Sequence, residues 1–319
     1  MASASRTVIG VGVGLVGLLS GCAATPDPQH VVCGLDADLA SRPGDVIAIG
    51  DGVWFRHGAL DEHGHCNNGF IECADFVLVV DANFPGGATA SLADIRKLSA
   101  KPVRFVFDTH HHGDHAYGNP VWAAAGAVPL AHENVVTEMA RYEPQRWQDA
   151  AKSREDVAAL GRETPMPPTL TYEKKLVVDD GTRRVEFLHF GTAHTRGDGF
   201  AYLPRQRILF SGDAVVNGPH NYMGDGDTRS WIRVLDALLA LDVDVVAPGH
   251  GPCGDATLIR LQREYIAHLQ SQVALGIAAG KSVAELQASV EVPEHLQRWV
   301  GKMFADQIAK IHAELTATP

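Results

Sequence analysis

A histidine-rich segment is the feature of this sequence with the clearest chemistry. Residues 109–115 read Thr-His-His-His-Gly-Asp-His. Imidazole nitrogens and carboxylate oxygens are ligands of zinc, and catalytic zinc sites leave one position open for water. Because alternate residues leaving a strand point the same way, His110 and His112 are expected to face one centre. The turn at the glycine redirects Asp114 and His115, so one loop can serve two neighbouring metal ions.

Three further candidate ligands follow hydrophobic runs that are typical of strands. His194 lies in the segment Gly-Thr-Ala-His-Thr, Asp213 in Ser-Gly-Asp and His250 in Pro-Gly-His-Gly. Active sites of α/β proteins collect in loops at strand ends. We therefore expect these three residues to join the histidine-rich segment in one site. A surface cluster of histidines is the alternative, but it leaves the three downstream residues unexplained.

In this order the candidate ligands resemble the motif of the metallo-β-lactamase superfamily, and the resemblance extends over residues 45–255. It implies an αββα sandwich with the metal ions at one edge, between the two sheets. It also implies a first metal ion held by His110, His112 and His194, and a second held by Asp114, His115 and His250. Asp213 would bridge the two ions. His111 matches no ligand position, so we expect it to be exposed or to lie behind the ligands.

The aspartate at position 213 bears on the reaction. A bridging aspartate is similar to the glyoxalase II-like, lactonase and broad hydrolase branches of the superfamily, whereas true β-lactamases carry cysteine there or lack the bridge. β-Lactam hydrolysis is therefore allowed but not favoured. The resemblance implies a dinuclear zinc hydrolase whose metal-bridging hydroxide attacks an ester, thioester, lactone or amide carbonyl. The catalytic residue Asp114 is expected to steer the proton to the leaving group.

Metal identity separates this hydrolase from a second interpretation. Two zinc ions (Zn²⁺) per chain are the expectation, and iron or manganese fits similar nitrogen and oxygen ligands in relatives. The alternative is a non-hydrolytic, iron-dependent oxidoreductase or a sulfur-handling member of the same fold. One iron ion in place of two zinc ions would favour that alternative.

Polar residues near the candidate ligands are expected to line the pocket or support the ligands. His63 and His65 lie in a loop that overhangs the site in relatives. His65 is a candidate for substrate contact, and a solvated loop is the alternative interpretation. His220, Asn221 and Tyr222 follow Asp213 and are predicted to line the pocket. Asp81 ends a hydrophobic run and either orients a ligand histidine or serves a turn. Residues 224–227 are interpreted as a turn, and segments 57–68, 133–170 and 214–228 as the pocket walls.

The elements that must position these residues alternate between strands and helices. Hydrophobic runs predict strands at 45–49, 53–57, 68–73, 76–80 and 103–107, and again at 176–178, 185–190, 200–203, 207–210 and 243–247. Helical spacing occurs at 92–98 and after Asp227 or Thr228, where Trp231, Leu235 and Leu238 share one face. The fold class is therefore mixed α/β.

The order of these elements predicts the domain organisation. A metallo-β-lactamase-like domain is expected over residues 44–255, with a helical, proline-interrupted insertion or lid at 133–170. Residues 256–319 are predicted to form C-terminal helices of the same domain, broken at Gly280 and Pro293.

Composition narrows the class of partner. The chain has 319 residues, of which 45% are hydrophobic and 20% charged, so it can bury a sizeable core and is not a disordered protein. Its formal net charge of −11 repels phosphate backbones, which disfavours nucleic acid as a partner. We expect a small-molecule substrate. Composition leaves the oligomeric state open.

The amino terminus has the pattern of an export signal. Arg6 precedes an apolar run at 7–20, which is too short to span a bilayer of about 30 Å as a helix. The run ends in Leu19-Ser20-Gly21-Cys22, which resembles the lipobox of bacterial lipoproteins. The resemblance implies a signal peptide at 1–21, a lipid on Cys22 that anchors the chain to a membrane, and a tether at 22–43. Cleavage near Ala23 or Ala24 as an ordinary secreted protein is the alternative.

The predicted export bears on the cellular location and on the state of the cysteines. The expected location is the periplasm or the cell surface, and the outer membrane where the host has one. Disulfides are permitted there, and the four cysteines besides Cys22 allow three full pairings: Cys33, Cys66, Cys73 and Cys253. A strand between Cys66 and Cys73 would hold them about 23 Å apart. A disulfide needs Cα atoms within about 7 Å, so this pair is not expected to close.

Overall fold

The computed structural model describes residues 42–59 and 65–317. The expected signal peptide, the lipidation site Cys22, most of the tether, Cys33 and His63 lie outside the described residues. All the candidate metal ligands lie within them.

The first sheet contains seven strands among the described residues, in the order β1-β2-β3-β4-β5-β6-β7. Strands β1 to β4 are antiparallel neighbours, whereas β4 to β7 are parallel. The strands are β1 (Val46–Gly50), β2 (Val53–Arg56), β3 (Asn68–Glu72), β4 (Val77–Val80), β5 (Val103–Asp108), β6 (Val128–His132) and β7 (Leu170–Tyr172).

The second sheet has five strands in the described part of the chain, in the order β12-β11-β10-β9-β8. Strands β8 to β11 are antiparallel neighbours, and β11 and β12 are parallel. The strands are β8 (Lys175–Asp179), β9 (Arg184–Leu188), β10 (Phe200–Leu203), β11 (Ile208–Gly212) and β12 (Val245–Pro248). Each of the ten strands predicted from the sequence is present.

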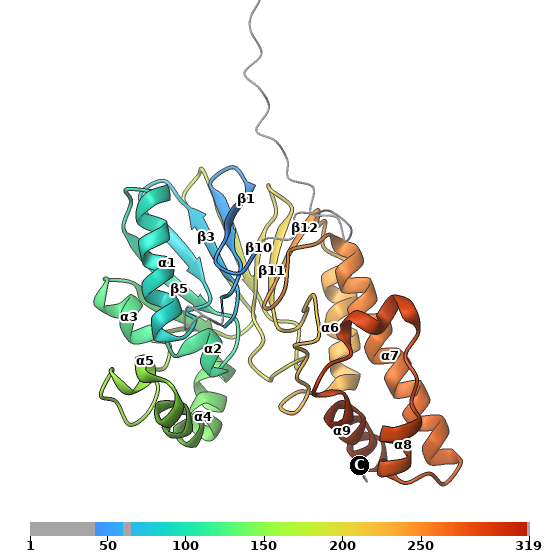
Figure 1. Cartoon of the computed structure of the whole chain (residues 1–319). Helices are drawn as coiled ribbons and strands as arrows, with labels where there is room; N and C mark the ends of the chain where they lie inside the picture. The colour runs from blue at the N-terminus through green and yellow to red at the C-terminus, as the bar shows by residue number, and fades with distance from the viewer. Residues whose placement is uncertain (1–41, 60–64, 318–319) are drawn as a thin grey trace, which may run out of the picture. The chain divides into compact units, whose positions relative to one another are not determined.

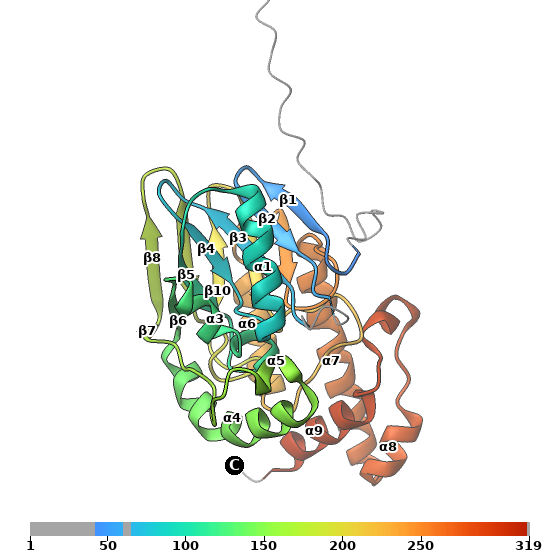
Figure 2. The same cartoon turned by 60° about the vertical axis from the view of Figure 1, so that its left-hand side comes forward.

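The two sheets pack face to face, with helices on both outer faces (Figures 1 and 2). The inner layer joins residues of both sheets, and the rings of Phe107 and Phe187 have centroids 4.6 Å apart. Helices α1 (Pro85–Leu98) and α3 (Asn119–Ala124) cover the first sheet, and α6 (Thr228–Leu239) and α7 (Ala256–Ala278) cover the second. This arrangement confirms the predicted αββα sandwich.

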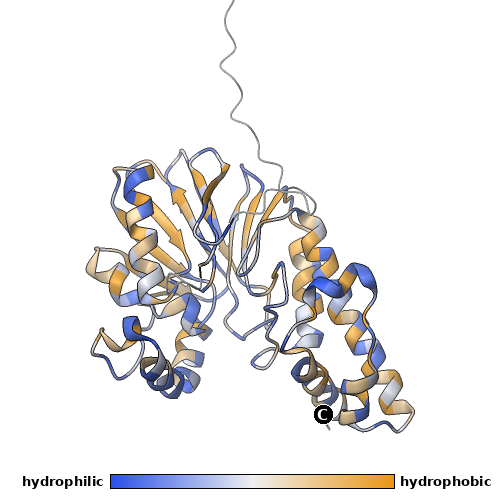
Figure 3. Cartoon of the chain, in the orientation of Figure 1, coloured by the Kyte–Doolittle hydropathy of each residue, from blue (hydrophilic) through white to orange (hydrophobic). Residues whose placement is uncertain are grey.

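Hydrophobic patterning explains why the elements take these places. The strands are drawn mostly in the hydrophobic colour in Figure 3, and all four residues of β4 are buried. Helix α6 buries Trp231, Leu235 and Leu238 on one face, as predicted. Full burial of each such side chain contributes about 1.5–3 kcal/mol. Asp227 caps the helix by accepting a hydrogen bond of 2.7 Å from the Ser230 amide, which confirms the predicted start.

The 133–170 segment is only partly as predicted. It forms α4 (Glu133–Ser153) and the short α5 (Glu155–Ala158), and its last residue begins strand β7. Pro144 lies inside α4 and does not interrupt it, so the expected proline break is wrong there. Strand β6, which precedes α4, was not predicted, because its sequence Val-Pro-Leu-Ala-His is short and contains a proline.

The C-terminal helices share the outer core of the second sheet. They are α7, α8 (Val283–Ser289), η2 (Glu294–Trp299) and α9 (Phe304–Thr316), so the predicted breaks at Gly280 and Pro293 are confirmed. Trp299, Ile308 and Ile311 join Trp231 in one hydrophobic cluster. Among the described residues, none of the helices combines the length and apolar character needed to cross a membrane.

Two of the cysteines lie at opposite ends of strand β3. Cys66 and Cys73 are buried, free thiols, which confirms that this pair does not form a disulfide. Cys253 is also buried. Burial raises the pKa of the Cys66 thiol to about 12, so this group stays protonated near neutral pH.

A stacked pair of histidines joins the first sheet to the loop after β9. The rings of His132 and His189 have centroids 3.7 Å apart. His132 Nε2 lies 2.7 Å from the carbonyl of Glu173, and His189 Nδ1 lies 2.8 Å from the carbonyl of Asp198. Burial, together with the neighbouring His189, lowers the pKa of His132 to about 4. The folded protein therefore holds His132 neutral.

We expect this histidine to destabilise the protein in acid. Its folded pKa of about 4 lies below the ordinary value of 6.5, so the unfolded chain binds more protons as the pH falls below 6.5. Between pH 7 and pH 5 the free energy of unfolding should fall by about 1–2 kcal/mol less in His132→Gln than in the wild type. Denaturant titrations at the two pH values measure this difference. The exposed His295→Gln variant is the control, and equal losses in all three proteins would contradict the prediction.

Candidate metal centre

Four loops from the two sheets meet at one edge of the sandwich. The pairing of β9, β10, β11 and β12 gives β9, β11 and β12 the same direction, so their carboxyl ends lie together. His194 follows β9, Asp213 follows β11 and His250 follows β12. The facing end of β5 in the first sheet supplies the 110–115 segment, whose last three residues belong to the short helix α2 (Gly113–Ala116). The structure therefore brings all seven candidate ligands together.

Three imidazoles form the first group of ligand atoms. His112 Nδ1 lies 3.1 Å from His110 Nε2 and 3.0 Å from His194 Nε2. Asp213 Oδ2 approaches the same group, at 3.6 Å from His194 Nε2. All three histidine atoms lie within reach of one ion.

The second group contains two carboxylates and two imidazoles. His250 Nε2 lies 3.2 Å from Asp114 Oδ2 and 3.3 Å from Asp213 Oδ2. His115 Nε2 lies 3.3 Å from Asp213 Oδ1 and 3.6 Å from Asp114 Oδ2. Asp213 is therefore the side chain that lies near ligand atoms of both groups.

The spacing of these atoms fits bound metal ions. Atoms bonded to one zinc ion at about 2.0–2.2 Å, with bond angles of about 90–110°, are about 2.8–3.6 Å apart. The distances within both groups fall in this range. Among the described residues, His115 Nε2, His250 Nε2 and Asp213 Oδ1 are buried without a hydrogen-bond partner. Because buried polar atoms are nearly always paired, these atoms fit a site that takes a cation.

In four of the five candidate ligand histidines, the second nitrogen lies near an oxygen atom. His194 Nδ1 lies 2.9 Å from the carbonyl oxygen of Tyr222, and His110 Nδ1 lies 3.1 Å from the hydroxyl of Thr109. His115 Nδ1 lies 3.0 Å from Asp81 Oδ2. His112 Nε2 lies 2.9 Å from Asp225 Oδ2. Such partners fix the tautomer and the orientation of a ligand histidine.

Charge differs between the two groups. Burial lowers the pKa of His194 to about 3 and holds that of His110 well below its ordinary value, so both rings are neutral, as metal ligands must be. Burial also disfavours charge on Asp213 and His250, but their mutual attraction outweighs it. The pKa of Asp213 is therefore well below its ordinary range, and that of His250 is raised to about 9. The carboxylates beside His250 thus attract positive charge, which a divalent cation would supply in place of the proton on His250.

Asp81 supports the ligand loop from the end of β4. One carboxylate oxygen accepts hydrogen bonds of 2.8 Å from the amide and the hydroxyl of Thr109, and the other lies beside His115. Its backbone has a φ of 63°, a conformation that non-glycine residues seldom adopt. The structure therefore favours the interpretation of Asp81 as an orienting carboxylate, and its position is held by a hydrogen bond of 2.6 Å from the Asn68 amide to its carbonyl.

The loop that carries His250 is fixed by a side chain of the first sheet. The Asn67 side-chain amide donates hydrogen bonds of 2.8 Å to the carbonyls of Pro248 and Gly251. Between them, Gly249 leaves room for the carboxylate of Asp213, because a Cβ at this position would overlap Asp213 Oδ1. The approach of Asp213 to His250 therefore requires glycine here.

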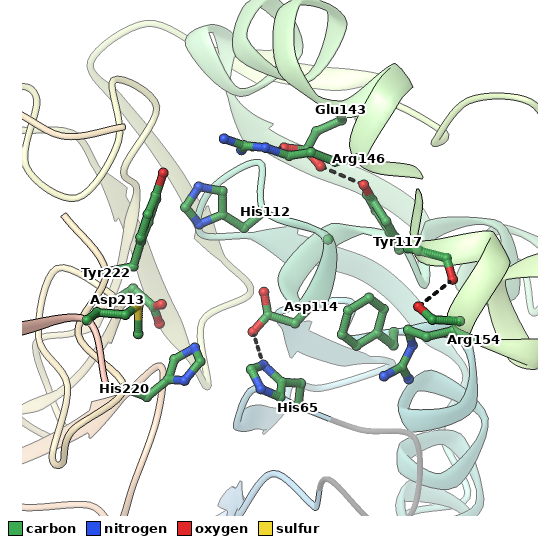
Figure 4. Close-up of a pocket in the computed structure, with 15 residues that line it drawn as sticks. His65, His112, Asp114, Tyr117, Glu143, Arg146, Arg154, Asp213, His220 and Tyr222 are labelled. Atoms are coloured by element: carbon green, nitrogen blue, oxygen red, sulfur yellow. Dashed lines mark hydrogen bonds and ion pairs between the residues drawn. The ribbon is translucent and has the colours of Figure 1, made fainter. Parts of the chain in front are cut away.

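A cavity of about 640 Å³ opens beside the ligands (Figure 4). It reaches from His112, Asp114 and Asp213 to the side chains of Arg146 and Arg154. Its lining comes from the three segments predicted as walls, which confirms that prediction, and also from Phe84, Tyr117 and Met303. The volume of the cavity and its mixture of charged and apolar lining side chains suit a small-molecule substrate.

Three of the four predicted pocket residues line this cavity. His65, His220 and Tyr222 face it, and His65 Nδ1 lies 2.6 Å from Asp114 Oδ2. The prediction for Asn221 is wrong, because its side chain is buried behind the wall, where its oxygen accepts a hydrogen bond of 3.3 Å from Gln262. The side chains alternate along this segment, so the neighbours of Asn221 point into the cavity and Asn221 points away.

Sequence reasoning missed a charged cluster beside His112. It consists of His111, Glu143, Arg146 and Asp225. His111 is fully buried, which excludes the exposed position and leaves the place behind the ligands. Residues 224–227 do form a turn at their start, but Asp225 is also a partner of a candidate ligand. The local signal was weak, since the 143/146 spacing on one helical face is common on solvated helices.

Comparison with known proteins agrees with this geometry. The family model of the metallo-beta-lactamase superfamily matches residues 62–250. The chain is 28% identical over 265 residues to a linear primary-alkylsulfatase of Pseudomonas sp. (strain ATCC 19151), covering 71% of this chain and 50% of that protein. It is 25% identical over 268 residues to an acyl-coenzyme A thioesterase of Bos taurus, covering 76% of this chain and 94% of that protein.

A solved structure has a similar fold. The stereoselective inverting sec-alkylsulfatase from Pseudomonas sp. superimposes with a TM-score of 0.64 at 17% sequence identity, over 86% of this chain and 50% of that one. This likeness supports the fold alone. The chain spans about half the length of both alkylsulfatases.

Proposed function

The chain belongs to the metallo-β-lactamase superfamily, and from this premise we propose that it is a dinuclear zinc hydrolase of small molecules. The observation that carries the proposal is the pair of ligand groups that share Asp213. One group presents the nitrogens of His110, His112 and His194, and the other presents Asp114, His115 and His250. Mixed nitrogen and oxygen ligands of this kind suit zinc.

The ligands would hold two ions at the floor of the cavity. Bound zinc ions supply a Lewis acid and lower the pKa of water so that hydroxide is available near neutral pH. The side chains then decide the geometry: Asp213 ties the two groups together, and Asp81, Asp225 and the Tyr222 carbonyl fix the imidazoles. Asp114 faces the cavity next to His65, where it can pass a proton to a leaving group.

We propose a carbonyl substrate, an ester, thioester, lactone or amide, as the first candidate. The thioesterase relative supports this class. A sulfate ester is the second candidate, favoured by the alkylsulfatase relative and by two arginines, Arg146 and Arg154, in the cavity lining. The apolar side chains Phe84 and Met303 would accommodate the alkyl part of either substrate.

We also propose that the hydrolase is exported and anchored through a lipid on Cys22. The support is the apolar run at 7–20 and its Leu19-Ser20-Gly21-Cys22 ending. Mass spectrometry of the membrane fraction from cells that express the full chain tests this. A lipidated amino terminus at Cys22, absent in Cys22→Ser, is expected; an unmodified Cys22 in membrane-bound protein would contradict it.

Metal content and turnover test the catalytic proposal together. The protein is purified without added metal, and its zinc, iron and manganese are measured on the sample that is assayed. The substrates are a simple thioester, a p-nitrophenyl ester, nitrocefin and dodecyl sulfate. We expect about two zinc ions per chain and chelator-sensitive hydrolysis of at least one substrate. One iron ion per chain without hydrolysis would overturn the proposal in favour of a non-hydrolytic member of the fold.

A further inference from the structure

A carboxylate outside the candidate ligand set contacts the ligand His112. Asp225 lies in the loop between β11 and α6, and its Oδ2 is 2.9 Å from His112 Nε2. The other nitrogen of this ring, Nδ1, faces His110 and His194. The imidazole is therefore held between the first ligand group on one side and a carboxylate on the other.

Helix α4 supplies the counter-charge for this carboxylate. Arg146 Nη1 donates a hydrogen bond of 2.8 Å to Asp225 Oδ2, and Nη2 donates one of 3.2 Å to Asp225 Oδ1. The same guanidinium donates a hydrogen bond of 2.9 Å to Glu143, which also accepts one of 2.6 Å from the hydroxyl of Tyr117. A guanidinium bound through both oxygens restricts how the carboxylate can turn.

These contacts favour a positioning role over a third metal site. His111, His112 and Asp225 do cluster closely enough to hold an ion. However, Arg146 already occupies both oxygens of Asp225 and brings the positive charge that the carboxylate needs. His111 Nε2 lies 3.7 Å from Asp225 Oδ2, farther than a hydrogen bond.

We propose that Asp225 and Arg146 form a positioning pair that holds His112 in its metal-binding orientation. The inference rests on the proposed metal centre. It gives the 133–153 helix a role in that centre, because Arg146 links it to the loop on the other side of the cavity. In Figure 4, Arg146 lies beside His112 at the cavity wall. Glu143 is buried, with 1% of its side chain exposed, and Asp225 is partly buried, with 9% of its side chain exposed.

Cobalt binding to the full chain tests this without reliance on turnover. Cobalt replaces zinc and reports ligand geometry through its visible absorption, and competition with a chromogenic chelator gives the affinity of each equivalent. Asp225→Ala should weaken one of the two cobalt equivalents by about 10–100-fold and change its spectrum. Asp225→Asn should lose less cobalt affinity, because the amide oxygen can still accept a hydrogen bond from His112 Nε2. The cobalt affinity of Arg146→Met should lie between those of the wild type and Asp225→Ala.

A control comes from the same helix. Lys152 donates a hydrogen bond of 2.7 Å to Asp149, and both residues are exposed on α4, so Lys152→Met removes an ion pair that involves no candidate ligand and should leave both cobalt equivalents unchanged. Circular dichroism establishes that each variant is folded.

The outcomes separate this inference from the proposed function. Folded Asp225→Ala with wild-type cobalt affinity and spectrum would overturn the inference while leaving the proposed function in place. A wild-type protein that binds no cobalt or zinc would overturn both. A fall from three bound ions to two in Asp225→Ala would also overturn the inference, because Asp225 would then be a metal ligand itself.

Discussion

Asp213→Ala is expected to lose both metal ions and nearly all hydrolytic activity. The carboxylate lies 3.3 Å from His115 and from His250 in one ligand group and 3.6 Å from His194 in the other, so its removal takes a ligand atom from both groups. Loss of a hydrogen-bond partner of a ligand typically costs about 10–100-fold in affinity or activity, and loss of a shared ligand should exceed that. Metal analysis after gel filtration and steady-state assays measure the effect.

Two variants complete this experiment. His110→Ala removes a ligand of the first group alone, so it should lose less metal than Asp213→Ala. Asp236→Asn breaks an exposed ion pair with Arg263 on α6 and α7 and should keep full metal and activity. Full metal content and full turnover in Asp213→Ala would show that the metal centre has been assigned to the wrong residues.

Removal of metal is expected to lower thermal stability as well as activity. The cavity floor brings together the carboxylates of Asp114 and Asp213, whose negative charge a divalent cation would balance, and imidazoles that could ligate it. An ion that binds only the folded chain, present at about 1,000 times its Kd, stabilises it by about 4 kcal/mol. Since each kcal/mol shifts Tm by about 2–4 °C in a large domain, chelation should lower Tm by about 10 °C. Thermal unfolding followed by circular dichroism measures this.

Addition of single metal ions to the chelated protein identifies which ion is required, and the Asp213→Ala variant identifies where it binds. Zinc should restore both Tm and turnover, whereas magnesium should not, because it prefers all-oxygen ligands. In Asp213→Ala the chelator should have little further effect on Tm. An unchanged Tm and unchanged turnover in the chelated wild type, with its metal shown to be gone, would contradict a metal-dependent mechanism.

Local pattern in the sequence was sufficient for ten of the twelve strands among the described residues and for the seven candidate ligands, but not for strands β6 and β7. Alternation and continuous hydrophobic runs located the strands, because side chains of a strand alternate between faces whatever it packs against. The helix after Asp227 was predictable from its cap and its apolar face. The seven candidate ligands were identified because each lies in a loop that leaves the carboxyl end of a strand, and loops at one edge of a sheet are neighbours. Their binding of metal stays a prediction.

The tertiary structure decided which side chains surround those ligands. His112 and Asp225 are 113 positions apart in the chain and belong to loops of different sheets. Their contact depends on how the two sheets pack, which no local pattern encodes. The same holds for Arg146, which reaches Asp225 from α4, for the burial of His111, and for Asn221, which faces the core. The sequence by itself determined which residues leave the strands at the site, because that depends on short-range backbone geometry. Only the packing of sheets and helices determined which partners orient them.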